Sequence, residues 1–452
     1  MKIVIAGSGK VGTTLALRLS SEGYDITLID NNQQVLQEVC EQCDAMGVQG
    51  NCASMPVLQQ AGIQDADLLI AATSADEVNL LCCTTAHGIH PKLHTIGRIR
   101  NPDYTQQIHA MRDVFALSLA VNPELQAARE VERLLRFPGF LRRDTFAKGR
   151  SAIVELRVED DSPLRGVRLM QMNSIVKCKV LVCAVLRDGN AMIPGGHFVL
   201  EAGDRIFVTA PTSDLSVLLK NLGIITRKVR KVLICGGGRV SHYLAEKLCK
   251  SGISVSLIEQ NYERCVALAA ALPDVTVVHG DATDQSLLES QGLSDCDALV
   301  TMTGLDELNM IISLYGTTKS VPQVITKLGR AENRSISDEL ALGSVICPRE
   351  LCCDDIVRYV RAMEKQSGSA ISVHSIADSQ VEAIEFLVDN DTLHCGEMLK
   401  NIRTRPDTLL VSITHGSDAQ IPNGDSSFQP GDNVVVVTSA RGKLRQLNDI
   451  FA

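Results

Sequence analysis

The stretch Lys2-Ile3-Val4-Ile5-Ala6-Gly7-Ser8-Gly9-Lys10-Val11-Gly12 decides the fold of this chain. It begins with the apolar run of a buried strand and continues through a glycine-rich turn into a helical pattern. In a parallel α/β sheet, such a turn holds a phosphate group against the N-terminus of the helix, where backbone N–H groups have no partner in the helix. The stretch therefore predicts a Rossmann-type unit that binds a dinucleotide.

A second copy of this unit begins 229 residues further along the chain. Lys231-Val232-Leu233-Ile234-Cys235 runs into Gly236-Gly237-Gly238-Arg239-Val240-Ser241. Asp30, at the end of the next strand pattern, is matched by Glu259 at the same offset. Agreement at these and later landmarks indicates an internal duplication. A dehydrogenase ordinarily pairs one nucleotide domain with one substrate domain, so the duplication favours a sensor built for symmetric assembly.

Strand and helix patterns alternate within both units, which predicts a doubly wound parallel sheet in each. Short alternating strand patterns after each unit are typical of a small α+β domain, and a proline-led segment predicts a helical connector before it. The fold class is therefore α/β, with two Rossmann-like domains that are each followed by a small α+β domain. The predicted division is a first Rossmann-like domain at 1–120, a helical connector at 121–145, a first C-terminal domain at 146–227, a second Rossmann-like domain at 228–345, a second connector at 346–368 and a second C-terminal domain at 369–452.

Composition narrows the class of protein. The chain has 452 residues and a net charge of −9, whereas a general nucleic-acid binder would be basic. No apolar run approaches the roughly 18 residues that cross a bilayer, and the strand pattern at the start predicts no signal peptide. The 15 cysteines lack a regular framework, which indicates a reducing cytoplasm. For Cys40 and Cys43, core packing is favoured over a redox or zinc site, because no second pair follows.

The first glycine turn carries a complete dinucleotide fingerprint. Gly7 permits the tight turn, Gly9 lets the backbone approach a pyrophosphate, and Gly12 lets helix and strand pack closely. Asp30 adds a carboxylate at a strand end, where it accepts hydrogen bonds from adenine-ribose hydroxyls and favours NAD over NADP. A helix-entry loop without a ligand is the alternative. The acid and the strand–turn–helix context occur together, which favours binding.

The second glycine turn is less complete. Gly236 and Gly238 are present and Glu259 keeps the carboxylate, but Ser241 stands where the first copy has Gly12. Serine is small enough to keep strand and helix fairly close. Nucleotide binding is expected in this half too, and a retained fold with an empty pocket is the alternative.

Further candidates lie where strands end, because ligands of open parallel sheets bind at the carboxyl edge. The spacing of Arg98 and Arg100 puts two guanidinium groups on one face, suited to phosphate or to salt bridges at an interface. The predicted nucleotide-binding residues of the first unit are Gly7, Ser8, Gly9, Lys10, Val11, Gly12, Asp30, Asn31, Asn51, Thr73, Arg98 and Arg100. Those of the second unit are Gly236, Gly237, Gly238, Arg239, Val240, Glu259, Asp281, Thr303 and Lys327. No metal ligands are predicted.

With the runs Thr73-Ser74-Ala75-Asp76-Glu77-Val78-Asn79-Leu80 and Arg98-Ile99-Arg100-Asn101-Pro102, the two units resemble RCK (KTN) domains. Residues 151–225 and 370–452 are similar to the RCK C-terminal (TrkA-C) domain, and the tandem order resembles the TrkA family of regulatory subunits of Trk-type bacterial potassium uptake. The resemblance implies a homo-tetramer whose eight RCK domains form a ring. It implies docking on a TrkH-like potassium-conducting membrane subunit, at the cytoplasmic face of the inner membrane. The implied ligands are NAD(H), ATP or ADP and, in some C-terminal domains, cyclic di-AMP.

The functional hypothesis is a gating ring rather than an enzyme, with nucleotides shifting the ring between two conformations. The alternative is an NAD-dependent oxidoreductase with duplicated Rossmann domains. That activity needs an acid–base group beside a substrate pocket, and neither half shows a recognisable catalytic set. A redox-sensing transcription regulator is disfavoured, because no basic DNA-binding element is present.

Overall fold

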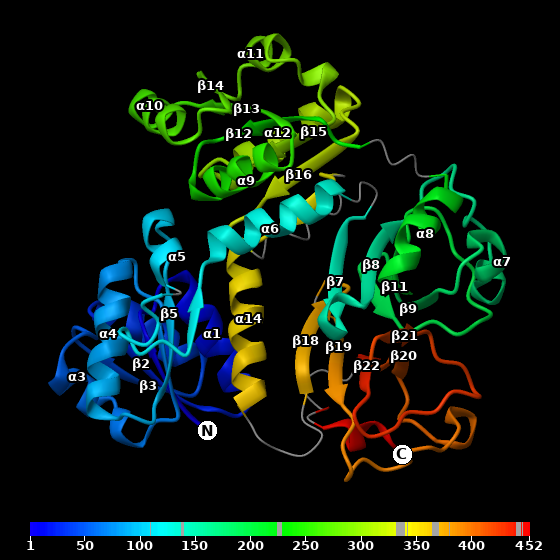
Figure 1. The fold of residues 1–452 in the computed structure, drawn as a ribbon, viewed down its shortest axis with the longest axis horizontal. Helices are drawn as coiled ribbons and strands as arrows, with labels where there is room; N and C mark the ends of the chain where they lie inside the picture. The colour runs from blue at the N-terminus through cyan, green and yellow to red at the C-terminus, as the bar shows by residue number, and fades with distance from the viewer. Residues whose placement is uncertain are drawn as a thin grey trace.

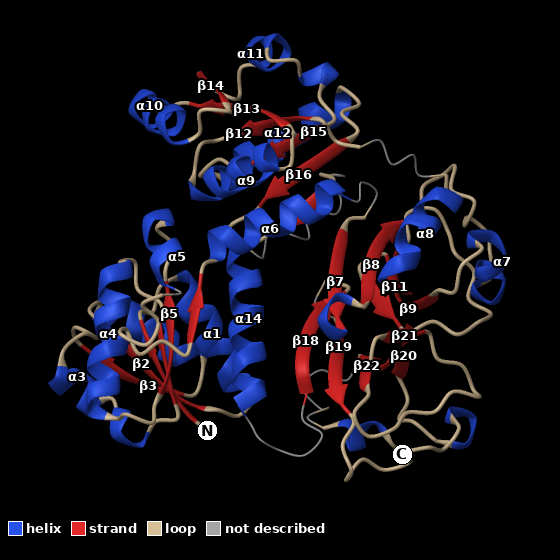
Figure 2. Ribbon diagram, viewed as in Figure 1, coloured by secondary structure: helices blue, strands red, loops and turns tan. Residues whose placement is uncertain are grey.

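A computed structural model describes the chain apart from residues 109, 137–139, 224–227, 331–339, 341, 364–369, 379, 440–443 and 445. It contains four domains, with the two Rossmann-like domains on one side and the two C-terminal domains together on the other (Figure 1). Parallel sheets flanked by helices and antiparallel sheets are distinct in Figure 2. The predicted fold class is confirmed. In the described residues, no helix is long and apolar enough to cross a membrane.

The first Rossmann-like domain is a six-stranded parallel sheet in the order β3-β2-β1-β4-β5-β6. Its central strands are apolar and buried on both faces, as a sheet covered by helices on both sides requires. The strands are β1 (Lys2–Ala6), β2 (Asp25–Asp30), β3 (Ala45–Gln49), β4 (Leu68–Ala71), β5 (His94–Arg98) and β6 (Leu119–Val121). The helices are α1 (Lys10–Ser21), α2 (Gln33–Gln42), α3 (Met55–Gln60), α4 (Asp76–Ile89) and α5 (Pro102–Ile108). The sequence patterns did not predict α5 or β6.

The second Rossmann-like domain repeats this order as β14-β13-β12-β15-β16-β17, again all parallel. Identical topology in both halves confirms the internal duplication. Its strands are β12 (Lys231–Cys235), β13 (Ser254–Glu259), β14 (Thr276–His279), β15 (Ala298–Thr301), β16 (Gln323–Lys327) and β17 (Ser344–Ile346). Its described helices are α9 (Arg239–Lys250), α10 (Tyr262–Ala271), α11 (Gln285–Ser290) and α12 (Asp306–Thr318).

Each C-terminal domain is a five-stranded antiparallel sheet with short helical segments. The first has the order β10-β9-β11-β8-β7 and the second has the matching order β21-β20-β22-β19-β18. The elements of the first are β7 (Arg142–Phe146), β8 (Ser151–Arg157), α7 (Met172–Val176), β9 (Leu181–Arg187), β10 (Asn190–Met192), β11 (Arg205–Pro211) and α8 (Leu215–Asn221). Those of the second are β18 (Ala370–Ile376), β19 (Val381–Leu387), β20 (Thr408–His415), β21 (Asp418–Gln420) and β22 (Asn433–Thr438). Strand β7 spans the predicted boundary at 146.

The two C-terminal sheets pack against each other through a shared apolar cluster. Phe146 and Phe207 from the first domain meet Val411 and Val435 from the second, and all four side chains are buried. Ala147 N donates a hydrogen bond to the Glu385 carboxylate across the same interface. The two halves of the chain are therefore joined at this end by a continuous core.

The connecting helices are exchanged between the halves (Figure 1). Helix α6 (Pro123–Arg136) leaves the first Rossmann-like domain and buries its apolar face in the core of the second. Helix α14 (Pro348–Met363) does the reverse and buries Cys353 and Ile356 in the core of the first. The Arg18–Asp354 ion pair at 2.6 Å fastens α14 to α1. Each Rossmann-like domain is thus completed by a helix that follows the other.

Candidate functional site

The first glycine turn has a backbone that only glycine tolerates at two positions. Gly7 has φ +100°, and a Cβ there would lie 3.0 Å from the backbone of Thr73 at the end of β4. A Cβ at Gly12 would lie 1.8 Å from the Gly7 carbonyl oxygen, so helix α1 can start this close to β1 only without a side chain. The turn is therefore held tight between two strands of the sheet.

Helix α1 presents an open N-terminus to the carboxyl edge of the sheet. Its N-cap residue is Gly9, and among the described residues no side chain caps the first turn. A Cβ on Gly9 would meet no protein atom within 4 Å, and Gly9 lines a cavity. Uncapped N–H groups and the positive end of the helix dipole suit a phosphate group at this point.

Asp30 at the end of β2 fixes the turn from the side. Its Oδ2 accepts a hydrogen bond from the Ser8 N–H at 2.6 Å, and its Oδ1 accepts one from the Asn32 N–H at 2.9 Å. Each carboxylate oxygen can accept a second hydrogen bond. The carboxylate can therefore hold the glycine turn and still bind ribose hydroxyls.

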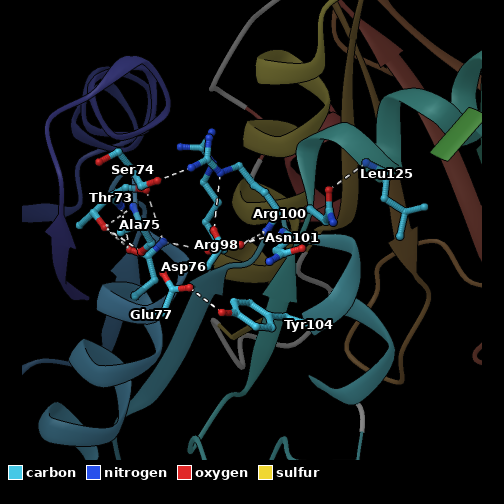
Figure 3. Close-up of polar contacts among 12 residues, drawn as sticks. Thr73, Ser74, Ala75, Asp76, Glu77, Arg98, Arg100, Asn101, Tyr104 and Leu125 are labelled. Carbon is cyan, nitrogen blue, oxygen red and sulfur yellow. Dashed lines mark hydrogen bonds and ion pairs between the residues drawn. The ribbon is translucent and has the colours of Figure 1, made fainter. Parts of the chain in front are cut away.

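A hydrogen-bond network builds the opposite wall at the start of α4 (Figure 3). The Thr73 N–H and hydroxyl both donate to Asn79 Oδ1, at 2.8 and 2.7 Å. Asp76 Oδ2 accepts the Arg100 N–H at 2.8 Å and the Asn101 N–H at 2.7 Å. Asp76 and Asn79 are both buried, so the network ties the ends of β4 and β5 to one rigid helix terminus.

The two arginines after β5 play different parts. The Arg100 guanidinium donates to the Ser74 carbonyl and lies 3.6 Å from Asp76, so it is held by the wall itself (Figure 3). Burial, and then the charge of Arg100, lower the pKa of Arg98. The buried Nε atoms of Arg98 and Arg100 both lack a hydrogen-bond partner within the described ranges, but the Arg100 guanidinium also contacts Ser74 and Asp76. Arg98 therefore has more unused donor capacity beside the cavity than Arg100.

These walls enclose a cavity of about 580 Å³, within the size range of nucleotide and cofactor sites. Ser8 and Gly12, although predicted as site residues, lie behind its lining and shape the turn. The predicted residues that line it are Gly7, Gly9, Lys10, Val11, Asp30, Asn31, Asn51, Thr73, Arg98 and Arg100. The cavity is also lined by residues that the sequence analysis did not predict, namely Gly50, Cys52, Ala72, Ser74, Ala75 and Val78. The sequence feature that could have identified these residues is their position next to the ends of predicted strands. In the described residues, no group of three or more His, Cys, Asp or Glu could hold a metal ion.

The second glycine turn repeats the same geometry. Glu259 Oε2 accepts the Gly237 N–H at 2.6 Å, as Asp30 does with Ser8. Ser241 is buried, and its hydroxyl donates to the Gly236 carbonyl. Serine thus takes the place of the third glycine without breaking the turn. Gly238 is the N-cap of α9, and Arg239 and Val240 form the first turn of that helix.

Two basic side chains at this second edge donate hydrogen bonds to backbone carbonyls. Lys327 Nζ donates to the Thr303 carbonyl at 2.6 Å, and burial lowers the pKa of Lys327. Arg264 Nε donates to the Gly237 carbonyl at 2.6 Å. Asp281 accepts hydrogen bonds from the N–H and the hydroxyl of Thr283, both at 2.8 Å, and so stabilises the turn in which it lies. Each of these polar side chains therefore already has a hydrogen-bond partner within the chain.

The chain matches two known domain types over most of its length. The TrkA-N domain matches residues 3–121 and 232–348, and the TrkA-C domain matches residues 153–223 and 383–452. Fold and site thus define a tandem of two TrkA-N domains, each followed by a TrkA-C domain. The chain belongs to the TrkA family.

Relatives match from end to end. The Trk system potassium uptake protein TrkA of Halomonas elongata is 30% identical over 456 residues, covering 100% of this chain and 98% of that protein. The Trk system potassium uptake protein TrkA homolog of Archaeoglobus fulgidus is 30% identical, with 100% of both chains covered. The shared length includes both halves of the duplication.

Solved structures of the GsuK channel and of its RCK domain share this fold. The GsuK channel bound to NAD superposes with a TM-score of 0.62 at 18% identity, over 98% of this chain and 77% of that one. The GsuK RCK domain gives a TM-score of 0.62 at 18% identity, over 98% of this chain and 93% of that one. At 18% identity, the similarity to these two structures shows a shared fold and nothing more specific.

Proposed function

We propose that the chain is a nucleotide-sensing regulatory subunit of a Trk potassium uptake system. It binds NAD(H) and ATP or ADP in the cavity of the first Rossmann-like domain, and it controls a membrane ion-conducting subunit rather than catalysing a reaction. The observation that carries the proposal is the cavity itself, where an uncapped helix N-terminus, Asp30 and Arg98 face one another. The full-length match to Trk system proteins supplies the transport context.

The chemistry of the cavity fits an adenine nucleotide. The N-terminus of α1 offers N–H groups for phosphate oxygens, and the Asp30 carboxylate offers acceptors for ribose hydroxyls. Lys10, Arg98 and Arg100 supply positive charge around the same space. Three cations suit a ligand with two or three phosphate groups.

The exchanged helices α6 and α14 can transmit a change at the nucleotide site to the rest of the assembly. A nucleotide that prefers one relative position of the two Rossmann-like domains shifts the chain toward that position, by its differential affinity alone. Helices α6 and α14 join both domains to the C-terminal pair, so such a shift is transmitted along them. In the proposed assembly four chains form a ring of eight RCK domains, on the cytoplasmic face of the membrane against a TrkH-like subunit.

Binding and mass measurements on the purified protein test the proposal. Calorimetric titration with NAD, NADH, ATP, ADP and cyclic di-AMP gives affinity and stoichiometry, and light scattering gives the mass. A tetramer that binds NAD(H) and ATP, and that leaves NADH unconsumed with a panel of carbonyl substrates, supports it. A dimer that binds only NAD(H) and turns over a carbonyl substrate would establish the oxidoreductase instead.

The second Rossmann-like domain is proposed to bind nucleotide more weakly than the first. Lys327 and Arg264 already bond to backbone carbonyls beside its glycine turn, and a ligand would have to displace them. One tight site per chain is therefore expected. Two equivalent tight sites would contradict this asymmetry.

A further inference from the structure

A second cavity, of about 270 Å³, lies where the exchanged helices meet the C-terminal domains. Residues of α6, α14, β7, β17 and β18 line it, and Figure 1 shows α6, α14, β7 and β18 gathered at the centre of the molecule. Five arginines, five carboxylates and one histidine belong to the lining. The cavity shares no lining residue with the nucleotide cavity, so it is a separate site.

The cavity lies on the pseudo-twofold axis that relates the two halves of the chain. Asp144 on β7 and His374 on β18 are equivalent, because they are 230 residues apart, as are the residues that pair with them across the sheet. These two equivalent residues contact each other, with His374 Nδ1 at 3.1 Å from Asp144 Oδ1. In a symmetric interface, residues that meet their own equivalents lie on the twofold axis. Both halves of the chain therefore contribute to the same cavity.

The two exchanged helices contribute equivalent ion pairs to the lining. On α6, Arg133 lies 3.4 Å from Glu130, and on α14, Arg358 lies 3.1 Å from Asp355. The two arginines are 225 residues apart, and so are the two acids. None of the four side chains is fully buried. Ion pairs with this exposure stabilise a fold only weakly, so a ligand can replace them at little cost.

The arginines of the lining keep donors that the protein does not use. The buried Nε of Arg358 has no hydrogen-bond partner among the described residues. Arg129, one turn before Arg133 on α6, is exposed beside the same cavity. Guanidinium groups in such positions can donate to an incoming oxygen without first breaking a strong contact.

Carboxylates of the lining are already engaged by cations. Asp144 is held by Arg142 at 2.9 Å and by His374 at 3.1 Å. Asp354 is held at 2.6 Å by Arg18, which lies outside the cavity. Spare donors and occupied acceptors favour a ligand that brings oxygen acceptors of its own. No metal ion is indicated, because in the part of the chain that the structure describes no group of three or more His, Cys, Asp or Glu could hold one.

We infer that this cavity binds a small multivalent oxyanion between helices α6 and α14. The guanidinium groups of Arg133 and Arg358 turn from their carboxylates to the anion, whose paired oxygens fit the planar N–H fork of arginine. The volume is below the roughly 300–1,000 Å³ of most ligand pockets. A ligand of the size of pyrophosphate or a short dicarboxylate is therefore favoured over a whole nucleotide.

The inference goes beyond the proposed function and does not depend on nucleotide binding. Helix α6 is buried in the core of the second Rossmann-like domain, and α14 is buried in the core of the first. An anion that contacts both helices favours the relative position of the two domains in which both contacts are made. The cavity is thus a second effector site, at the crossing of the two connectors.

Titration calorimetry of the full chain with inorganic pyrophosphate tests the site. Phosphate and succinate are titrated in parallel, because they distinguish a phosphate ligand from a carboxylate ligand. Saturating NADH is present, so that the nucleotide cavity is filled. Binding of pyrophosphate or succinate at one site per chain is expected. Absence of binding by all three anions would overturn the inference.

Arginine substitutions locate the bound anion. Arg133→Gln and Arg358→Gln should each weaken its binding by about tenfold or more, the value of one lost charge-assisted hydrogen bond. Arg136→Gln is the matched control on α6, since Arg136 pairs with Glu132 and does not line the cavity. Equal losses in Arg133→Gln and Arg136→Gln would show a general effect of charge and would overturn the site.

Arg98→Gln distinguishes the two cavities, because Arg98 lines only the nucleotide cavity. It should leave anion binding as in the parent. A loss in Arg98→Gln alone would place the anion in the nucleotide cavity and would overturn the inference. Failure of NADH to bind would contradict the proposed function, whereas the separate effects of Arg133→Gln and Arg358→Gln would still establish the anion site.

Glu130→Gln gives a readout of the opposite sign. The substitution removes the carboxylate that competes with the anion for Arg133, so anion binding should strengthen by up to about fivefold. Glu132→Gln makes the same change in net charge outside the cavity and should have no such effect. Equal gains in both variants, or a loss of binding in Glu130→Gln, would contradict the exchange of Arg133 from its carboxylate to the ligand.

Discussion

The Tyr243 hydroxyl, on helix α9 of the second Rossmann-like domain, donates a 3.0 Å hydrogen bond to the Arg100 carbonyl in the first. The same hydroxyl accepts a hydrogen bond from Asn122 Nδ2, also at 3.0 Å, at the entry to α6. Arg100 in turn borders the candidate nucleotide cavity. One buried phenol therefore joins the first site, the connector and the second domain.

Replacing that phenol should loosen the link between the domains. Tyr243→Phe removes two hydrogen bonds, each worth about 0.5–1.5 kcal/mol, so a lower Tm is expected. The nucleotide-induced rise in Tm should also change, because Arg100 loses its contact with the second domain. Tyr104→Phe is the matched control, since the Tyr104 hydroxyl bonds Glu77 within the first domain. Equal effects of both substitutions, measured by scanning calorimetry with and without NADH, would argue against an inter-domain role.

Arg98 and Arg100 should contribute unequally to phosphate binding. Arg98 has unused donor capacity, whereas Arg100 is held by Ser74 and Asp76. Arg98→Gln is therefore expected to weaken ATP binding by about 10- to 100-fold, the value of one to two charge-assisted hydrogen bonds. ADP binding should weaken less if Arg98 contacts the terminal phosphate. Titration calorimetry of Arg98→Gln and Arg100→Gln with ATP and ADP measures these losses of affinity. A larger ATP-specific loss of affinity in Arg100→Gln would reverse the assignment.

Asp30 should dominate recognition of the adenosine half of the ligand. Asp30→Asn retains an acceptor for the Ser8 N–H but loses the charge that strengthens bonds from ribose hydroxyls. Affinity for NADH is expected to fall by roughly 10-fold or more. Glu259→Gln makes the same change in the second domain and should leave the tight site unaltered. NADH affinity is measured by fluorescence titration. An equal loss of affinity in Glu259→Gln and Asp30→Asn would contradict this prediction.

Glu130 on α6 should make the protein less stable at higher pH. Burial, and then the charge of Asp144, raise the pKa of Glu130 above its unfolded value of about 4.3. A carboxyl with a raised pKa in the folded state favours folding while protonated, so the free energy of unfolding falls as pH rises through that window. Glu130→Gln should therefore gain Tm relative to the parent at pH 8 and lose that gain near pH 4.

The neighbouring Glu132→Gln serves as the control for this pH effect. Glu132 pairs with Arg136 at 2.7 Å and with Lys247 at 3.5 Å, so its neutralisation removes attractive contacts. No gain at pH 8 is expected from it. A gain of equal size in both variants would show that net charge, rather than burial of Glu130, governs the pH dependence.

The exchange of helices predicts where a core mutation acts. Ile356 lies in α14, late in the chain, but it is buried in the core of the first Rossmann-like domain. Ile356→Ala should cost about 2–5 kcal/mol and should increase amide exchange in strands β1 and β4. Val131→Ala in α6 is the reciprocal case and should act on β12 and β15. Amide hydrogen exchange is measured by mass spectrometry. If each substitution raised amide exchange only in the half of the chain that carries it, the swapped positions of the two helices would be refuted.

Local pattern predicted the Rossmann-like domains because their decisive features are short in range. The tight turn at Gly7, the close approach at Gly12 and the acid at Asp30 all lie within one strand–turn–helix–strand unit. Alternating strand and helix patterns were equally local, and they gave the correct fold class. Strand β6 has three residues and α5 has seven, too short for a clear period, so neither was predicted.

The sequence by itself determined the duplicated α/β fold, the glycine turns and the residues that gather at the carboxyl edge of each parallel sheet. Only the tertiary structure decided that α6 and α14 exchange partners and that Ser74 and Asp76 hold the guanidinium of Arg100. The physical reason is that periodicity and turn chemistry act over a few residues. Side-chain contacts between segments distant in sequence depend on how completed elements pack, which a short stretch of sequence does not encode.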